Sequence, residues 1–172
     1  TTDNQYEPNV AMNNFGEITV SWHGTGVGFT SGSAAWIQAY DNDGTVWGDN
    51  TSVNNGSSAS RTDIAADKSA DTTRGGNFVI TFDSNSADDA SGIFAKFIPR
   101  CDVTGCDITN SSELLVNTST TGVQTFSSIA TDGMGNFTIS WVDQNSDSDG
   151  YDVFAQNFRY NKGLPYGALS RS

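Results

Sequence analysis

Basic side chains and long apolar runs are what this sequence has least of. Only eight of its 172 residues are Lys or Arg, against 20 acidic residues, and the formal net charge is −12. Nucleic-acid binding needs clustered Lys and Arg on the phosphates, so this charge balance excludes nucleic acid as a partner. No apolar stretch approaches the roughly 20 residues of a membrane-spanning helix, so we expect no membrane span.

Glutamate is scarce as well. Glu7, Glu17 and Glu113 are the only glutamates, every other acidic residue is Asp, and Gly occurs 18 times. Asp, Asn and Gly favour turns, whereas helices favour Ala, Leu, Glu and Lys. The composition therefore predicts a β-rich chain with many turns, in which four Trp and ten Phe supply material for a core.

One pattern occurs three times along the chain. A Gly precedes an alternating apolar stretch at 16–22, 76–82 and 135–141, and each stretch ends in an aromatic residue. A second shared stretch, with an aromatic residue at its second position, follows at 35–40, 93–98 and 153–158. Alternation with a period of two, in β-branched and aromatic residues, predicts half-buried strands.

Each repeat is expected to form four short strands, which in the first repeat lie at 9–12, 17–22, 35–40 and near 45–53. A four-stranded antiparallel unit repeated in tandem is typical of a β-propeller blade. We therefore predict an all-β fold of three blade-like units at 1–54, 55–119 and 120–172. A β-sandwich assembled from the same hairpins is the alternative.

Three blades are too few for an ordinary propeller, which closes with about four to eight. The strands and faces at the two ends of such a stack must find partners. We expect either further repeats, or another copy of this chain bound head to tail, or three units closed by a different geometry.

The two cysteines, Cys101 and Cys106, enclose a short loop in the second unit. A tight turn can bring their Cα atoms within bridging range, so we predict a disulfide that pins an insertion in this unit. A disulfide indicates an oxidising compartment, and we expect the protein to be extracellular.

A loop in the third unit has the spacing Asn-x-Asp-x-Asp-Gly at 145–150. Oxygen ligands at alternate positions, with a Gly that lets the chain turn sharply, suit a hard cation such as calcium. The equivalent loop of the second unit has fewer carboxylates, and solvated turn residues are the alternative interpretation for both loops. The candidate calcium ligands are Asp143, Asn145, Asp147, Asp149 and Asp152, together with Asp83, Asn85 and Asp89.

Catalysis has little support in the sequence. His23 is the only histidine, it directly follows Trp22, and no nucleophile or metal motif is tied to it, so we expect a surface residue at a strand end. Asp residues in turns are explained by turn chemistry, and we predict that the protein is not an enzyme. Trp47 and Tyr166, near equivalent turns, are candidates for stacking on a sugar ring.

The repeat also carries a fuller pattern: Val-Ala-x-Asp, Gly-x-Phe-x-x-x-Trp, Phe-Ala-Gln-x-Phe, Gly and Val-Asn. Stretches 129–132 and 154–158 follow it closely, whereas the second unit has Lys96 in place of Gln and the cysteine insertion. This pattern resembles the tandem β-repeats of large secreted bacterial surface and adhesin-type proteins.

The resemblance implies an extracellular structural or adhesive repeat protein, a segment or subunit of a larger surface, matrix or fibre assembly. It implies no enzyme. The alternative function is a carbohydrate-binding β-propeller module, whose partners would be surface glycans.

Overall fold

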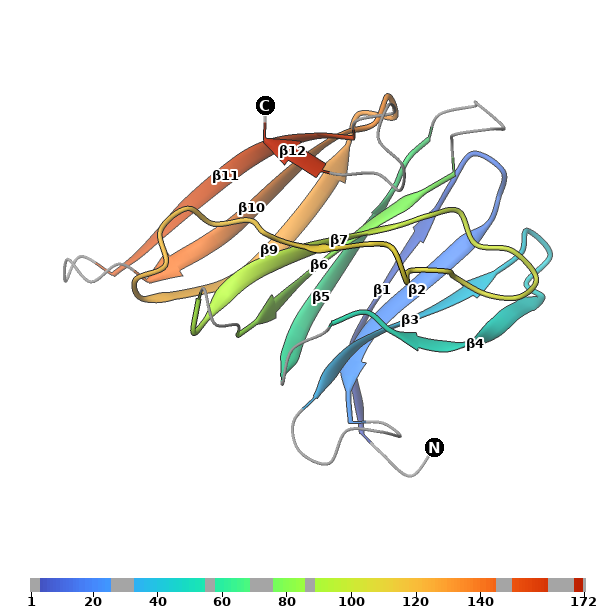
Figure 1. Cartoon of the computed structure of the whole chain (residues 1–172), viewed down its shortest axis with the longest axis horizontal. Helices are drawn as coiled ribbons and strands as arrows, with labels where there is room; N and C mark the ends of the chain where they lie inside the picture. Colours follow the sequence, from blue (N-terminus) through green and yellow to red (C-terminus); the bar gives the residue numbers. More distant parts are fainter. Residues whose placement is uncertain are drawn as a thin grey trace.

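The computed structural model of the chain describes residues 4–25, 33–54, 58–68, 76–85, 89–144, 150–160 and 169–171, which form three four-stranded sheets (Figure 1). The first sheet contains β1 (Gln5–Met12), β2 (Ile18–Gly24), β3 (Ala34–Tyr40) and β4 (Val46–Ser52). The second contains β5 (Ala59–Ala66), β6 (Phe78–Ser84), β7 (Gly92–Ile98) and β8 (Glu113–Leu115). The third contains β9 (Val123–Thr131), β10 (Asn136–Gln144), β11 (Tyr151–Tyr160) and β12 (Leu169–Arg171). The described ranges contain no helix that is long and apolar enough to cross a membrane.

Strands lie in chain order within each sheet, and neighbouring strands are antiparallel. The three sheets follow one another in series, and the first strand of the second sheet contacts the first strands of the other two (Figure 1). The middle sheet is thus covered on both faces, which does not occur in a two-sheet sandwich. The prediction of an all-β fold with three blade-like, four-stranded units is confirmed.

The two faces of each sheet differ in side-chain size, because successive residues of a strand point to opposite sides. We call the face with the large side chains of the second strand the front face, and the opposite one the back face. Front-face residues of the second strands are Ile18, Val20 and Trp22, then Phe78, Ile80 and Phe82, then Phe137, Ile139 and Trp141. Their back-face neighbours are Thr19 and Ser21, then Val79 and Thr81, then Thr138 and Ser140.

The core lies between the sheets. The back face of the first sheet, with Ile37 and Ala39, packs in one cluster with Phe78 and Phe82 on the front face of the second. The back face of the second sheet packs in the same way on the front face of the third, in a second cluster. Full burial of a large apolar side chain stabilises a fold by about 1.5–3 kcal/mol, so these two interfaces are the main source of stability.

The Val-Asn pairs at 53–54 and 116–117 hold the start of the third strand in their sheets. In the first pair, the Val N–H donates to the Ala35 carbonyl at 2.8 Å, and the Asn Oδ1 accepts from the Ala35 N–H at 3.0 Å. The second pair makes the same two bonds to Ile93, both at 2.8 Å. Each Asn side chain thereby satisfies a buried N–H that the fourth strand does not reach.

The predicted disulfide between Cys101 and Cys106 is confirmed, with Cα atoms 4.4 Å apart. Its loop belongs to the second unit but lies on β4 of the first, where a Cβ added to Gly48 would come within 2.5 Å of the Thr104 carbonyl oxygen. Trp47, the residue before Gly48 on β4, is half-buried and packs against the core cluster between the first and second sheets. The insertion therefore clamps the outer strand of the neighbouring sheet.

Strand positions agree with the sequence pattern except at the first strand. The predicted strands at 17–22 and 35–40 correspond to β2 and β3, whereas β1 begins at Gln5 rather than at Asn9. A bulge interrupts the alternation between these two residues, so the periodicity reveals only the second half of the strand. The boundaries of the three repeat units stay a prediction.

Candidate functional site

The first strand of each sheet has a bulge at the same place. The pairing of β1, β5 and β9 with the second strand shifts register at 6–9, 60–63 and 125–128. At each bulge one residue other than Gly has a positive φ: Glu7 at 51°, Arg61 at 48° and Phe126 at 56°. A residue with a Cβ costs about 1–2 kcal/mol in this left-handed region. Strain of this kind persists only where the surroundings enforce it, and it clusters at ligand sites.

His23 and Asp83 hold the bulges of the sheet that follows. His23 Nδ1 accepts from the Arg61 N–H at 3.4 Å, and Asp83 Oδ2 accepts from the Phe126 N–H at 3.4 Å. Each acceptor directly follows the last front-face aromatic residue of its second strand, so the two occupy equivalent positions. The same contact is therefore repeated at both junctions between sheets.

The expectation that His23 is a surface residue is wrong. Its side chain is only 13% exposed and lies 3.6 Å from the Glu7 carboxylate. Its ring stacks on Tyr6, with the ring centroids 5.5 Å apart. His23 therefore joins the bulge of its own sheet to the bulge of the next.

Asp83 places a buried carboxyl group in this region. It is 8% exposed, and its Oδ2 accepts from Arg61 Nη1 at 3.2 Å and from the Thr125 hydroxyl. Its Oδ1 is buried and has no hydrogen-bond partner among the described residues. Burial raises the pKa of Asp83, although the bonds from Thr125 and Arg61 act in the opposite direction.

A hollow of about 260 Å³ opens beside Asp83, between the second and third sheets. Hydroxyl groups dominate its lining, which includes Ser58, Ser60, Ser84, Ser91 and Thr125. Phe126, next to this hollow, is 60% exposed, and the Arg61 guanidinium lies 4.5 Å from its ring centroid. We call the hollow, Arg61, Asp83 and Phe126 the bulge site. It combines an exposed ring face, a cation, a buried carboxyl group and several hydroxyls.

The predicted calcium ligands of the second unit face different partners. Asp89 accepts from Asn117 Nδ2 at 2.6 Å and from the Ser91 N–H at 2.9 Å, whereas Asp83 faces Arg61 and Thr125, and Asn85 is exposed. Across the ranges that the structure describes, no three His, Cys, Asp or Glu side chains are grouped so that they could hold a metal ion.

In the third unit, Asp143 and Asp152 lie opposite each other on β10 and β11. Asp143 is 2% exposed and its buried Oδ1 has no described partner, while Asp152 is exposed. The predicted ligands Asn145, Asp147 and Asp149 lie outside the described residues. Calcium binding therefore stays a prediction.

Trp47, one of the two candidate sugar-stacking residues, is not part of the bulge site. Trp47 packs against the first core cluster, and Tyr166 lies outside the described residues. Sequence reasoning missed Glu7, Arg61 and Phe126, because an acid, a base and an aromatic ring at equivalent positions share no pattern. The only common signal is the interrupted alternation of the first strands.

No family model matches the chain, and no curated protein sequence matches it either. Solved structures of other proteins share its fold, and two of them are enzymes. One is an exo-1,5-alpha-L-arabinanase from a bovine ruminal metagenomic library, with a TM-score of 0.57, 14% identity and 100% of this chain covered. The other is an alpha-L-arabinofuranosidase from Lactobacillus brevis, with a TM-score of 0.55, 12% identity and 96% of this chain covered. This chain spans 58% and 57% of their lengths.

The prediction that the chain has no enzymatic role is corrected by this comparison. These two solved structures are enzymes, and their likeness to this chain extends over all or nearly all of it. The prediction rested on the absence of a His-based or nucleophile motif and on the explanation of the Asp residues by turn chemistry. These grounds were insufficient, because glycoside hydrolysis needs only two carboxyl groups at a suitable separation, and a role in a turn does not prevent a carboxyl group from acting.

Proposed function

We propose that the chain is a three-blade part of a β-propeller that binds an oligosaccharide at the bulge site. The observation that carries this proposal is the buried Asp83 carboxyl group, whose Oδ1 lacks a described partner while an exposed ring stands beside it. The likeness in fold to two enzymes named for arabinose-containing glycans supports the choice of ligand class.

The chemistry of the bulge site suits a sugar ring. An exposed aromatic ring offers a flat apolar face for the C–H face of a sugar, and Arg61 holds the Phe126 ring in place. Hydroxyl side chains and the free oxygen of Asp83 supply hydrogen-bond partners for sugar hydroxyls. A hollow of about 260 Å³ is a little below the ~300 Å³ at which drug-sized pockets begin, which suits one sugar unit of a chain.

In the whole protein, we propose that this site belongs to a glycoside-cleaving centre. Cleavage requires one carboxyl group that holds a proton and a second that is ionised. Asp83, whose pKa is raised by burial, suits the first role. Glu7 occupies the equivalent bulge of the first sheet and is connected to Asp83 through His23 and Arg61, so it is the candidate for the second.

Calorimetric titration with a panel of arabino-, xylo- and galacto-oligosaccharides tests the binding proposal. We expect at least one oligosaccharide to bind, and Phe126→Ala and Asp83→Asn to weaken it by about tenfold or more, since a lost stacking or buried polar contact costs at least ~1.4 kcal/mol. Tyr151→Ala, at a ring that is 70% exposed on β11, is the matched control and should bind normally. Equal binding by Phe126→Ala and the wild type would refute the site.

Release of reducing sugar from the bound oligosaccharide tests the cleavage proposal. The expected result is slow release by the wild type and none by Asp83→Asn or Glu7→Gln. Binding without release of reducing sugar would support the proposal of a binding module and would contradict a cleavage role for this segment.

A second candidate function is a structural repeat in a surface, matrix or fibre assembly, with units packed head to tail. The exposed apolar front face of the first sheet, with Val10 at 66% and Met12 at 53% exposure, favours this candidate. The disulfide supports an extracellular location for either function. Membership of the bacterial surface-repeat family remains a proposal based on the sequence pattern.

Calcium binding by the Asp-rich loop of the third unit is proposed as a feature of the same protein. Thermal melting with millimolar calcium and with a chelator tests it. We expect calcium to raise the melting temperature of the wild type but not of Asp143→Asn. An equal melting temperature in both conditions would remove the proposal.

A further inference from the structure

Both interfaces between sheets are built in the same way. At the first, Ile37 and Ala39 of a back face meet Phe78 and Phe82 of a front face, and all four are at most 3% exposed. At the second, the back face of the second sheet meets the front face of the third, where Phe137 is 1% exposed. A back face with its smaller side chains thus always receives a front face with large ones.

Among the three described sheets, none packs on the front face of the first. Val10 is 66% and Met12 is 53% exposed, whereas Ile64 and Ala66, at the equivalent places of β5, are 6% and 3% exposed. The aliphatic and aromatic side chains on β2 and β3 that share this face are only partly buried, Trp22 among them. A contiguous exposed apolar face of this kind marks an interaction surface.

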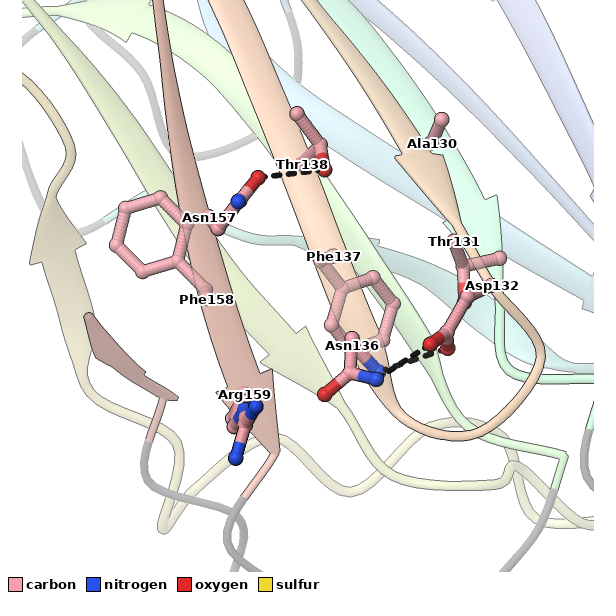
Figure 2. A pocket seen from close by; sticks show the side chains of 9 residues that line it. All are labelled: Ala130, Thr131, Asp132, Asn136, Phe137, Thr138, Asn157, Phe158 and Arg159. Atoms are coloured by element: carbon pink, nitrogen blue, oxygen red, sulfur yellow. Dashed lines mark hydrogen bonds between the residues drawn. The ribbon is translucent and has the colours of Figure 1, made fainter. Parts of the chain in front are cut away.

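No described sheet packs on the back face of the third sheet either. Val153 is 77% exposed and Ala155 is exposed, although the equivalent Ile93 and Ala95 of β7 are fully buried. Thr138 donates to Asn157 at 2.8 Å beside a hollow of about 420 Å³ on this sheet (Figure 2). Because this bond already pairs the two side chains, covering them leaves fewer unpaired polar groups.

We propose that a second copy of this chain covers both faces at once. The front face of the first sheet of each copy packs on the back face of the third sheet of the other copy. This proposal develops the head-to-tail packing described above, and it is independent of the bulge site, since Arg61, Asp83 and Phe126 lie at the internal junction of the second and third sheets.

The proposed partner follows from continuity with the two internal interfaces. The two uncovered faces are the two halves of one more interface of the same kind, and only another such sheet offers the matching half. Two copies supply six described sheets, and closed propellers contain about four to eight blades. The two interfaces between the copies are then identical by two-fold symmetry. The three described sheets of one copy leave both of these faces exposed.

Sedimentation velocity from low to high micromolar protein tests the proposal with two opposed variants. Val10→Lys alters the front face and Ala155→Arg alters the back face, and both positions are exposed, so both variants should fold, as circular dichroism can verify. We expect the wild type to dimerise and each variant to be monomeric. Mixing the two variants should restore a dimer that is weaker than that of the wild type, because one interface of the mixed pair carries neither substitution and the other carries both.

Val103→Lys, at a side chain that is 75% exposed on the disulfide loop, is the control and should dimerise like the wild type. A monomeric wild type at every concentration overturns the proposal, as does a species larger than a dimer. A dimer that survives Ala155→Arg but not Val10→Lys would show front-to-front pairing and also overturns it. Loss of the dimer in the control would place the contact elsewhere. Oligosaccharide binding measured on the same variants reports separately on the bulge site.

Discussion

Single buried side chains hold the ends of several strands in this protein. Asn117 accepts from the Ile93 N–H at 2.8 Å and donates to Asp89 at 2.6 Å, and it is 1% exposed. Its removal would leave a buried N–H and a buried carboxylate short of a partner. A buried polar group without a partner costs about 1–3 kcal/mol.

We therefore expect Asn117→Ala to lower the free energy of unfolding by about 1–3 kcal/mol in urea denaturation. Asn110→Ala, at an exposed position of the same unit, is the control and should change it by less than ~0.5 kcal/mol. Equal effects of the two substitutions would show that the Val-Asn pair has no special structural role.

Because the pKa of Asp83 is raised, its contribution to the stability of the fold should change with pH in a known direction. Burial raises its pKa above 3.8 in the folded protein, so its contribution to stability is full below that value and is lost as the pH rises through the raised pKa. The stability of Asp83→Asn relative to the wild type should therefore increase as the pH rises above about 4.

Asp102 is the control, because its pKa is shifted in the opposite direction. Hydrogen bonds from Thr104 lower its pKa, so its contribution is present above its unfolded pKa and is lost as the pH falls. Relative to the wild type, Asp102→Asn should lose stability as the pH rises. Urea denaturation at a series of pH values measures both, and parallel curves for the two variants would contradict the assignment.

Among the elements, β4 depends on a clamp from the neighbouring unit. Gly48 has a φ of 61°, and an added Cβ would meet the Thr104 carbonyl oxygen at 2.5 Å. Gly44 has a φ of 89°, but nothing lies within 4 Å of the place where its Cβ would be. Replacing either glycine by Ala would force a residue with a Cβ into a left-handed backbone conformation. Only at Gly48 would the new Cβ also collide with the disulfide loop.

Gly44→Ala should lower the melting temperature through the backbone cost alone, about 1–2 kcal/mol. Gly48→Ala should lower it further, because the disulfide loop must move off β4. Differential scanning calorimetry measures both variants. An equal decrease in the two would show that the loop does not press on β4.

Alternation predicts the second and third strands, because all of them except β11 bury at least one face along most of their length. The first strands are only partly predictable, since the bulges at Glu7, Arg61 and Phe126 break the period and none of these residues is a glycine that would signal a positive φ. The preceding sheets hold the bulges at Arg61 and Phe126 through His23 and Asp83, and contacts between residues so far apart in sequence leave no local signal.

At the scale of the whole molecule, stability depends on the stacking of sheets in series. Phe82 and Trp22 occupy equivalent positions, but Phe82 is fully buried at an internal interface while Trp22 lies on the uncovered front face. Phe82→Ala should cost about 3–5 kcal/mol.

Trp22→Ala should cost clearly less than Phe82→Ala at low protein concentration, where the chain is a monomer. Chemical denaturation measures the difference. Equal costs would indicate that the end face is already covered in the single chain.

The bulge site itself lies between two sheets and takes its residues from three strands that are distant in the sequence. The sequence marked Asp83 as an acidic loop residue, but its burial and its unpartnered oxygen arise only when the third sheet packs on the second. The chemistry of the bulge site is therefore a property of the assembled sheets, and repeat patterns alone do not reveal it.

A crystal structure with the tightest-binding oligosaccharide of the panel tests the central claim most directly. The account predicts a sugar ring stacked on Phe126, with one hydroxyl within hydrogen-bond distance of Asp83 Oδ1. A sugar bound at Trp47 or on the front face of the first sheet, with the bulge site empty, would contradict it.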